Sequence, residues 1–234
     1  MTTPVQRHQQ RVRAGLASAA APHGTTVQGS AYQLMQAQLY EHKRRLHDIK
    51  SVERKIEAKA QFVGIYDPWI DGVLAEGQGA QDQVFTTLLV WNIDVGNYER
   101  ALTMADYALQ HKLAMPDKYE RDLSTVLVDE FATAALSGKL PADEAMRLLG
   151  GVTHLTDEDD IHDQARAKLY KAIGYALIGK TPTQDADFTA LSLSQAQAAM
   201  QSLKRAFELF EGVGVKKDIE RLERRLKDLQ PPAS

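Results

Sequence analysis

Residues 79–115 decide the fold, and they read GAQDQVFTTLLVWNIDVGNYERALTMADYALQHKLAM. The apolar positions of the first half recur every three or four residues, which is the spacing of one helix face: Val84, Leu88, Trp91 and Val95. Gly96-Asn97 then interrupts the pattern with the residues that most readily leave helical dihedral angles. The stretch therefore predicts a helix, a short turn and a second helix.

The second helix of this stretch has small and apolar residues on its inner side, namely Ala101, Leu102, Ala105, Ala108 and Leu109. Alanines let two helix backbones approach closely, so we expect an antiparallel helical hairpin. The run from Gly96 to Leu102, followed by Ala108-Leu109, is similar to the second half of a tetratricopeptide unit. Such hairpins bury one face and expose another, so a helical-repeat scaffold for protein–protein contacts is one hypothesis for the function.

No segment of the chain alternates polar and apolar residues convincingly like a strand, so the predicted fold class is all-α. We expect a long basic N-terminal helix followed by antiparallel helical hairpins with tetratricopeptide-like packing. The predicted parts are a mobile basic arm (1–30), a basic coiled-coil-like helix for DNA binding or oligomerisation (31–61), a helical-hairpin core (62–180) and a C-terminal helical hairpin (181–234).

The composition is that of a globular protein. With 234 residues, 44% of them hydrophobic, the chain is long enough for one large or two small domains with a proper core. It contains no cysteine, which excludes disulfides and thiolate metal sites and fits a reducing cytosol. No apolar run approaches the length of a membrane span, so no membrane contact is expected.

The net charge of −3 conceals an asymmetry along the chain. Residues 1–61 contain ten Lys/Arg and four Asp/Glu, a net charge of +6, whereas the remainder carries −9. Such a division is typical of a basic, nucleic-acid-facing end on an acidic body. The alternative is that the basic end pairs with the acidic body.

The basic end has two predicted parts. Residues 1–30 contain no Asp or Glu and are rich in Ala, Ser and Gly, which predicts a mobile arm carrying Arg7, Arg11 and Arg13. Residues 31–61 have apolar residues on alternating three- and four-residue steps, which predicts one long helix that packs in coiled-coil fashion. Its flanks and back carry Lys43, Arg44, Arg45, Lys50, Arg54, Lys55 and Lys59. These ten cations are the predicted DNA-binding residues, because phosphates are their natural counterpart. A solvated basic helix packed on the core is the alternative.

Several blocks of sequence carry a family resemblance, and they are spread in order over nearly the whole chain: Thr3 to His8, Arg11-Val12, Gly79 to Asp82, Leu89 to Gly96, Tyr107 to Leu109, Met115-Pro116, Arg166 to Leu169 and Gly214 to Glu223. Together they resemble the small (packaging) subunit of the DNA terminase of peduovirus-type tailed phages, often labelled the terminase endonuclease subunit. The resemblance implies a DNA-binding, multimeric partner of a large motor subunit in the cytoplasm of the bacterial host.

One acidic cluster, Asp157-Glu158-Asp159-Asp160 with His162 and Asp163, is the candidate for a metal-dependent endonuclease, because such enzymes hold Mg²⁺ with carboxylates. Consecutive carboxylates on a helix point in different directions, however. Acids at a helix N-terminus are also explained by the helix macrodipole, and Thr156 with Asp159 resembles a capping box there.

Other signatures of catalysis are missing from the sequence. It has no Gly-Lys-Ser/Thr phosphate loop, no serine-nucleophile motif and no histidine pair with the spacing of a helical zinc site. We therefore predict no catalytic residue, no metal and no cofactor, and we expect ATPase and cleavage activity to reside in the large subunit.

The predicted function is that of a non-catalytic small terminase subunit, which binds viral DNA at the packaging-initiation (cohesive-end) site and presents it to the large ATPase/nuclease subunit. The predicted partners are double-stranded viral DNA, the large subunit and further copies in a homo-oligomer, expected to be a ring. Weak phosphate contacts would add up over such copies. The protein–protein scaffold and the metal-dependent DNA endonuclease are the two alternatives.

Overall fold

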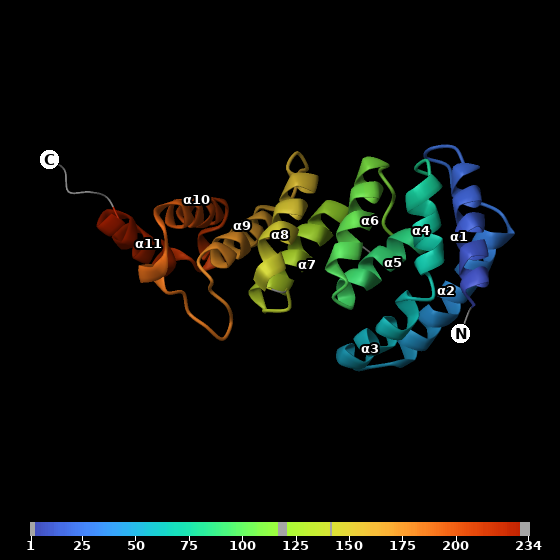
Figure 1. Cartoon of the computed structure of the whole chain (residues 1–234), viewed down its shortest axis with the longest axis horizontal. Helices are drawn as coiled ribbons and strands as arrows, with labels where there is room; N and C mark the ends of the chain where they lie inside the picture. The colour runs from blue at the N-terminus through green and yellow to red at the C-terminus, as the bar shows by residue number, and fades with distance from the viewer. Residues whose placement is uncertain (1–2, 117–120, 141, 230–234) are drawn as a thin grey trace. The chain divides into compact units, whose positions relative to one another are not determined.

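The computed structural model describes residues 3–116, 121–140 and 142–229, and within these ranges the chain forms helices and no β-strand (Figure 1). The all-α prediction is confirmed, whereas the tetratricopeptide-like packing stays a prediction. None of the described helices combines the length and the hydropathy needed to cross a bilayer.

The helices fall into two compact units, Met1–Leu123 and Ser124–Ser234. The first unit contains α1 (Pro4–Ala19), α2 (Ser30–Asp48), α3 (Val52–Val63), α4 (Asp67–Glu76), α5 (Gln83–Asp94) and α6 (Tyr98–Gln110). The second contains α8 (Ala142–Thr156), α9 (Asp163–Leu177), α10 (Leu193–Leu209), α11 (Lys216–Leu229) and nearly all of α7 (Leu123–Leu136). The expected divisions at 30/31 and 61/62 therefore fall inside the first unit, and the one at 180/181 falls inside the second.

The central hairpin predicted for residues 79–115 is present as α5 and α6 (Figure 1). Every residue of α5 from Val84 to Ile93 is buried, so this helix is the core element of the first unit. Gly96 ends the hairpin's first half with a φ of 83°, a conformation that glycine adopts without a steric cost. Asn97 then donates a side-chain hydrogen bond to Asn92 Oδ1 over 3.1 Å, which fixes the turn.

Residues 3–30, which belong to the expected mobile arm, are held by hydrogen bonds at both ends of α1. Thr3 and Gln6 form a capping box, in which Gln6 N donates to Thr3 Oγ1 over 3.2 Å and Thr3 N donates to Gln6 Oε1 over 2.8 Å. After α1, Gln81 N donates to the Thr25 carbonyl over 2.6 Å and Val27 N donates to the Gln81 carbonyl over 3.0 Å. These backbone bonds attach the segment after α1 to the loop that precedes α5.

α1 packs closely on α4. Its inner face consists of the small buried residues Ala14, Gly15 and Ser18. A Cβ at Gly72 of α4 would meet the Arg11 carbonyl oxygen, and it would lie 2.7 Å from the Ala14 Cβ and 2.8 Å from the Gly15 nitrogen. The small residues that suggested a mobile arm therefore allow a close helix crossing instead.

The single long helix expected for residues 31–61 is broken at residues 49–51, which separate α2 from α3. Ile49 has extended backbone angles (φ −85°, ψ 126°), and Ser51 caps α3 by accepting a hydrogen bond from Arg54 N over 3.4 Å. Phe62 near the end of α3 stacks on His42 of α2, so the two helices fold back on each other. Residues 30–63 are called the α2–α3 hairpin below, and residues 48–55 are its tip.

A buried carboxylate holds the start of α5. Asp82 is 2% exposed, and it accepts hydrogen bonds from Phe85 N (2.9 Å) and from Trp69 Nε1 of α4 (2.8 Å). Trp69 also stacks on Tyr32 of α2, with ring centroids 5.7 Å apart, and it is a buried core residue. Burial away from water raises the pKa of Asp82 to about 6.

In the second unit, α9, α10 and α11 share one hydrophobic core. Gly174 of α9 leaves room for α10, since a Cβ there would lie 2.7 Å from Leu203 Cγ. The buried carboxylate of Asp218 in α11 accepts hydrogen bonds from Tyr175 Oη (2.9 Å) and from Lys180 Nζ (2.7 Å). The hairpin expected for residues 181–234 thus contains α10 and α11, and both belong to the same unit as α9.

Gly72→Ala tests the α1–α4 crossing. The added methyl group would collide with the backbone of α1, and overpacking of this kind costs about 1–3 kcal/mol. We expect a lower thermal unfolding temperature by circular dichroism. Gly150→Ala is the matched control, because nothing lies within 4 Å of a Cβ in that helical position, so this change should be neutral or stabilising. An unaltered stability of Gly72→Ala would contradict the packing of α1.

Asp82→Asn tests the buried carboxylate. Because its folded pKa of about 6 lies above the unfolded value, Asp82 favours the folded state most below pH ~4, and this contribution is lost as pH rises through 6. The free energy of unfolding of the wild type minus that of the variant should therefore increase as pH falls from 7 to 4, by up to about 3 kcal/mol. Trp69 and Trp91 lie in the first unit and report its unfolding by fluorescence. A pH-independent difference would contradict the assignment.

Candidate nucleic-acid interface

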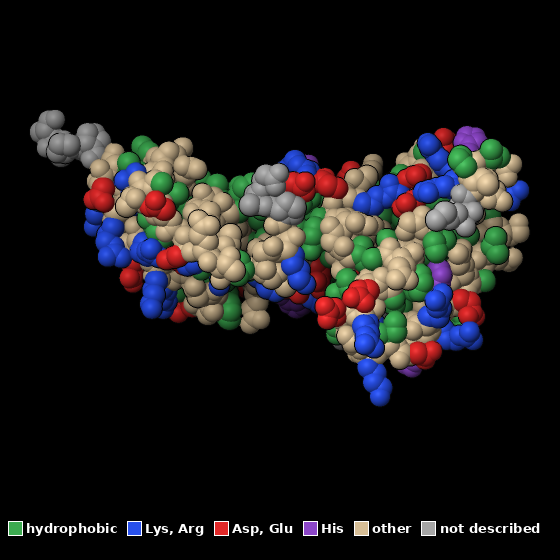
Figure 2. Space-filling model, turned by 60° about the horizontal axis from the view of Figure 1, so that its bottom comes forward, with side chains coloured by type: hydrophobic (Ala, Val, Ile, Leu, Met, Phe, Trp, Pro, Cys, Tyr) green, Lys and Arg blue, Asp and Glu red, His purple; other side chains and the backbone are tan. Residues whose placement is uncertain are grey.

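The ten predicted DNA-binding cations all lie in the first unit, on α1, α2, α3 and the turn between the last two. Figure 2 shows Lys and Arg side chains interspersed with acidic ones over this part of the surface, without a continuous basic patch. Which cations are available to a phosphate therefore depends on the bonds that each one already makes.

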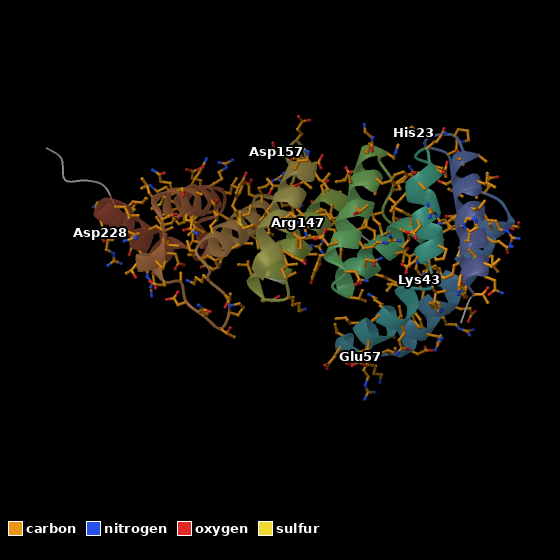
Figure 3. The ribbon with its side chains drawn as sticks, in the orientation of Figure 1. His23, Lys43, Glu57, Arg147, Asp157 and Asp228 are labelled. Atoms are coloured by element: carbon orange, nitrogen blue, oxygen red, sulfur yellow. The ribbon has the colours of Figure 1, made fainter. Side chains whose placement is uncertain are left out.

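The cations of α2 are largely engaged within the protein. Lys43 is half-buried and donates to Thr87 Oγ1 of α5 over 3.2 Å, and Figure 3 shows it on the side of α2 that faces the rest of its unit. The Arg45 guanidinium lies over the Phe62 ring, 5.2 Å from its centroid. Arg44 is exposed and pairs over 2.8 Å with Glu41, which is exposed as well. Such surface pairs contribute little to stability, so Arg44 can exchange this partner for another anion.

The cations of the tip and of α3 divide into one structural residue and three accessible ones. Lys59 pairs with Asp94 at the end of α5 over 2.5 Å. Lys50 and Arg54 are exposed and Lys55 is partly exposed, and none of these three side chains has a hydrogen bond or an ion pair with any residue that the structure describes. These three cations are concentrated at the tip of the hairpin.

Acidic side chains share the hairpin with these cations. Asp48 and Glu53 lie at the tip, and Figure 3 shows Glu57 on the outer side of α3. Attraction to a phosphate backbone therefore depends on the orientation in which the hairpin meets it, because the acids repel phosphates as strongly as the cations attract them.

On α1, the three arginines differ in their contacts. Arg7 lies 3.6 Å from Asp67 at the start of α4, and both side chains are partly exposed. Arg11 and Arg13 are exposed and make no ion pair with any described residue. All three project from a helix that packs on α4 and not from a free arm.

The open end of the α2–α3 hairpin is fixed by aromatic contacts. His42 is buried, its Nδ1 lies 2.7 Å from Tyr66 Oη, and its ring stacks parallel on Phe62 with centroids 4.0 Å apart. Burial, together with the nearby charge of Arg45, holds the pKa of His42 below its usual value. The imidazole is therefore neutral at pH 7, and α2 is held to Phe62 of α3 and to Tyr66 before α4 without a buried charge.

The acidic cluster of residues 157–163 lies in the second unit, between α8 and α9. The expected capping box is not formed, because Thr156 is the last residue of α8 and donates to the Val152 carbonyl over 2.8 Å. Asp159 accepts a short hydrogen bond from Ser124, and Asp157 points away from the ribbon (Figure 3). Among the described residues no three His, Asp or Glu side chains converge as metal ligands.

Several basic residues of α11 are engaged within the second unit. Arg221 pairs with Asp185 over 2.8 Å, Arg225 donates to the Leu191 carbonyl over 2.8 Å, and Lys216 lies 4.9 Å from the centroid of the Phe207 ring. They hold α11 to its own unit.

Sequence periodicity missed the tip because the apolar steps continue through the helix break. Ser51, a preferred N-cap residue, was the available signal for a second helix start. Periodicity also gave no sign that Val52, the first residue of α3, is 72% exposed next to the three accessible cations.

The fold and its surface define an all-helical protein with a basic hairpin as its candidate DNA contact. The chain belongs to the phage small terminase subunit family, whose family model matches residues 36–164.

Two relatives extend this match over most of the chain. The chain is 37% identical to the "Terminase, endonuclease subunit" of Escherichia phage P2 over 237 aligned residues, which cover 99% of this chain and 89% of that protein. It is 23% identical to the "Probable terminase, endonuclease subunit" of Haemophilus phage HP1 over 221 residues, which cover 91% of this chain and 74% of that protein. No solved structure matches. The family resemblance found in the sequence is confirmed, and it gives the protein a role in phage DNA packaging.

Proposed function

We propose that this protein binds viral DNA at the packaging-initiation (cohesive-end) site and presents it to the large ATPase/nuclease subunit of the terminase. The proposal is supported by family membership and by one observation, the cluster of accessible cations at the tip of the α2–α3 hairpin. Both partners are those of a small terminase subunit, and the host cytoplasm is where they would meet.

Lys50, Arg54 and Lys55 are the first residues to contact phosphates in this proposal, because their side chains have no partner to give up among the residues that the structure describes. Arg44 and Arg45 border them on α2 and can strengthen the contact. Lys43 and Lys59, which bond to Thr87 and Asp94 of α5, instead hold the hairpin to the core.

Phosphate neutralisation by so few cations gives weak binding by one copy, since each released counterion adds only a modest contribution. A homo-oligomer, expected to be a ring, repeats the hairpin around the assembly, and its weak contacts then add through multivalency. Light scattering should give a mass several times 26.0 kDa, and a strict monomer would contradict this mechanism.

The combined change Lys50→Gln, Arg54→Gln and Lys55→Gln tests the tip. On a duplex that contains the phage cohesive-end region, binding at low salt should weaken at least about tenfold. The slope of log affinity against log salt should also fall by about 0.9 for each phosphate that the variant no longer neutralises. Fluorescence anisotropy at several salt concentrations measures both quantities.

Lys217→Gln, Arg224→Gln and Lys227→Gln form the matched control. They remove the same number of positive charges from exposed positions of α11 in the other unit. The control variant should keep the wild-type affinity and salt slope. If both triple variants weaken binding equally, only the net charge matters and the tip is not the DNA surface.

An endonuclease is the second candidate, because the printed names of both relatives include "endonuclease subunit". We infer that this chain does not cleave DNA by itself, since its described residues bring no three metal-binding side chains together. Incubation of the purified protein with DNA and Mg²⁺ or Mn²⁺ should leave the duplex intact. Cleavage that disappears in Asp159→Ala with Asp160→Ala would contradict this inference.

A further inference from the structure

α1 has an apolar stripe beside the face that packs on α4. Val5 and Leu16 are each 66% exposed and Val12 is 46% exposed, although all three are large apolar residues. Their spacings of seven and four residues place them in one line along about three helical turns. An amphipathic helix normally buries such a stripe, whereas α1 buries its small residues on α4 and leaves the large ones outside.

A groove of about 370 Å³ runs beside this stripe, between α1 and α4. Val12 and Leu16 form one wall, and Gly72 and Ala75 of α4 contribute to the lining. Gly72 lies at the close crossing of the two helices, so the groove is bounded there by the backbones of α1 and α4. The stripe and the groove together offer an apolar surface whose shape suits the side chains of another helix.

The charges around this surface restrict what can occupy it. Residues 1–30 contain no Asp or Glu. Arg11 and His8 lie at the groove on one side of the stripe, and Arg13 lies 100° around the helix from Val12 on the other side. Glu76 of α4 also lines the groove, so the excess of positive charge comes from α1. DNA would use the arginines but has no counterpart for a line of aliphatic side chains, whereas a helix with an apolar stripe and acidic flanks complements both.

We propose that the outer face of α1 is the docking surface for an acid-flanked amphipathic helix of the large terminase subunit. The choice of partner rests on the proposed function. A second copy binding through the same face is disfavoured, because α1 itself contains no Asp or Glu and two α1 helices would bring their arginines together. The α2–α3 tip and the α1 stripe are then separate surfaces, so one protomer can hold DNA and the large subunit at the same time.

The double change Val12→Ser and Leu16→Ser tests the stripe, because it removes the apolar contact and keeps every charge. With the purified large subunit as the probe, its affinity should fall about tenfold or more by isothermal titration calorimetry. DNA affinity, its salt slope and the mass of the oligomer should stay at wild-type values. Arg13→Glu should weaken the same complex, because it introduces repulsion toward the acidic flank.

Leu193→Ser is the matched control, since Leu193 is 42% exposed on α10 in the other unit and should leave large-subunit binding unchanged. Thermal unfolding of all variants confirms that they are folded. The proposal is overturned if the wild type does not bind the large subunit or if the double variant binds it as well as the wild type does. A lower oligomer mass of the double variant would identify a second copy as the occupant of the stripe. Weaker DNA binding by the double variant would identify DNA as the occupant. Either result also overturns the proposal. The proposed function is tested separately by the DNA affinity of the Lys50→Gln, Arg54→Gln, Lys55→Gln variant, which leaves the α1 stripe unchanged.

Discussion

The stacking of His42 on Phe62, with its hydrogen bond to Tyr66, is the contact on which the candidate DNA surface depends. It joins the end of α3 back to α2 and so turns one amphipathic sequence into a hairpin. Burial keeps the imidazole neutral, so the contact requires no buried ion pair. With its open end fixed in this way, the hairpin presents its tip to solvent.

The contacts of the hairpin's cations depend on their position along it. Those near the open end and along the inner side bond to the core, as Lys43 does with Thr87 and Lys59 with Asp94. Lys50, Arg54 and Lys55 at the tip have no such partner in the described part of the chain. The apolar residues of α1 are divided in a similar manner, with small ones packed against α4 and large ones exposed. Both arrangements leave side chains on the surface that the fold itself does not need, and this is the physical basis for assigning two binding surfaces to one unit.

The central hairpin was predictable because its helical periodicity is interrupted by Gly96, whose positive φ the structure confirms. The break at residues 49–51 was not predictable from periodicity, because the apolar steps on either side stay in phase. The packing of α1 on α4 was not predictable either, since small residues are typical of both disorder and close helix crossings. Only the position of Gly72 against α1 distinguishes a close crossing from disorder.

The most direct test of the DNA surface uses the absence of cysteine from the chain, which makes any introduced thiol unique. Val52→Cys at the tip, Val12→Cys on α1 and Leu193→Cys on α10 each receive the same photoactivatable crosslinker. After irradiation with the cohesive-end duplex, we expect a DNA adduct from position 52 and little from positions 12 and 193. Adducts from position 12 or 193 without any from position 52 would contradict the account.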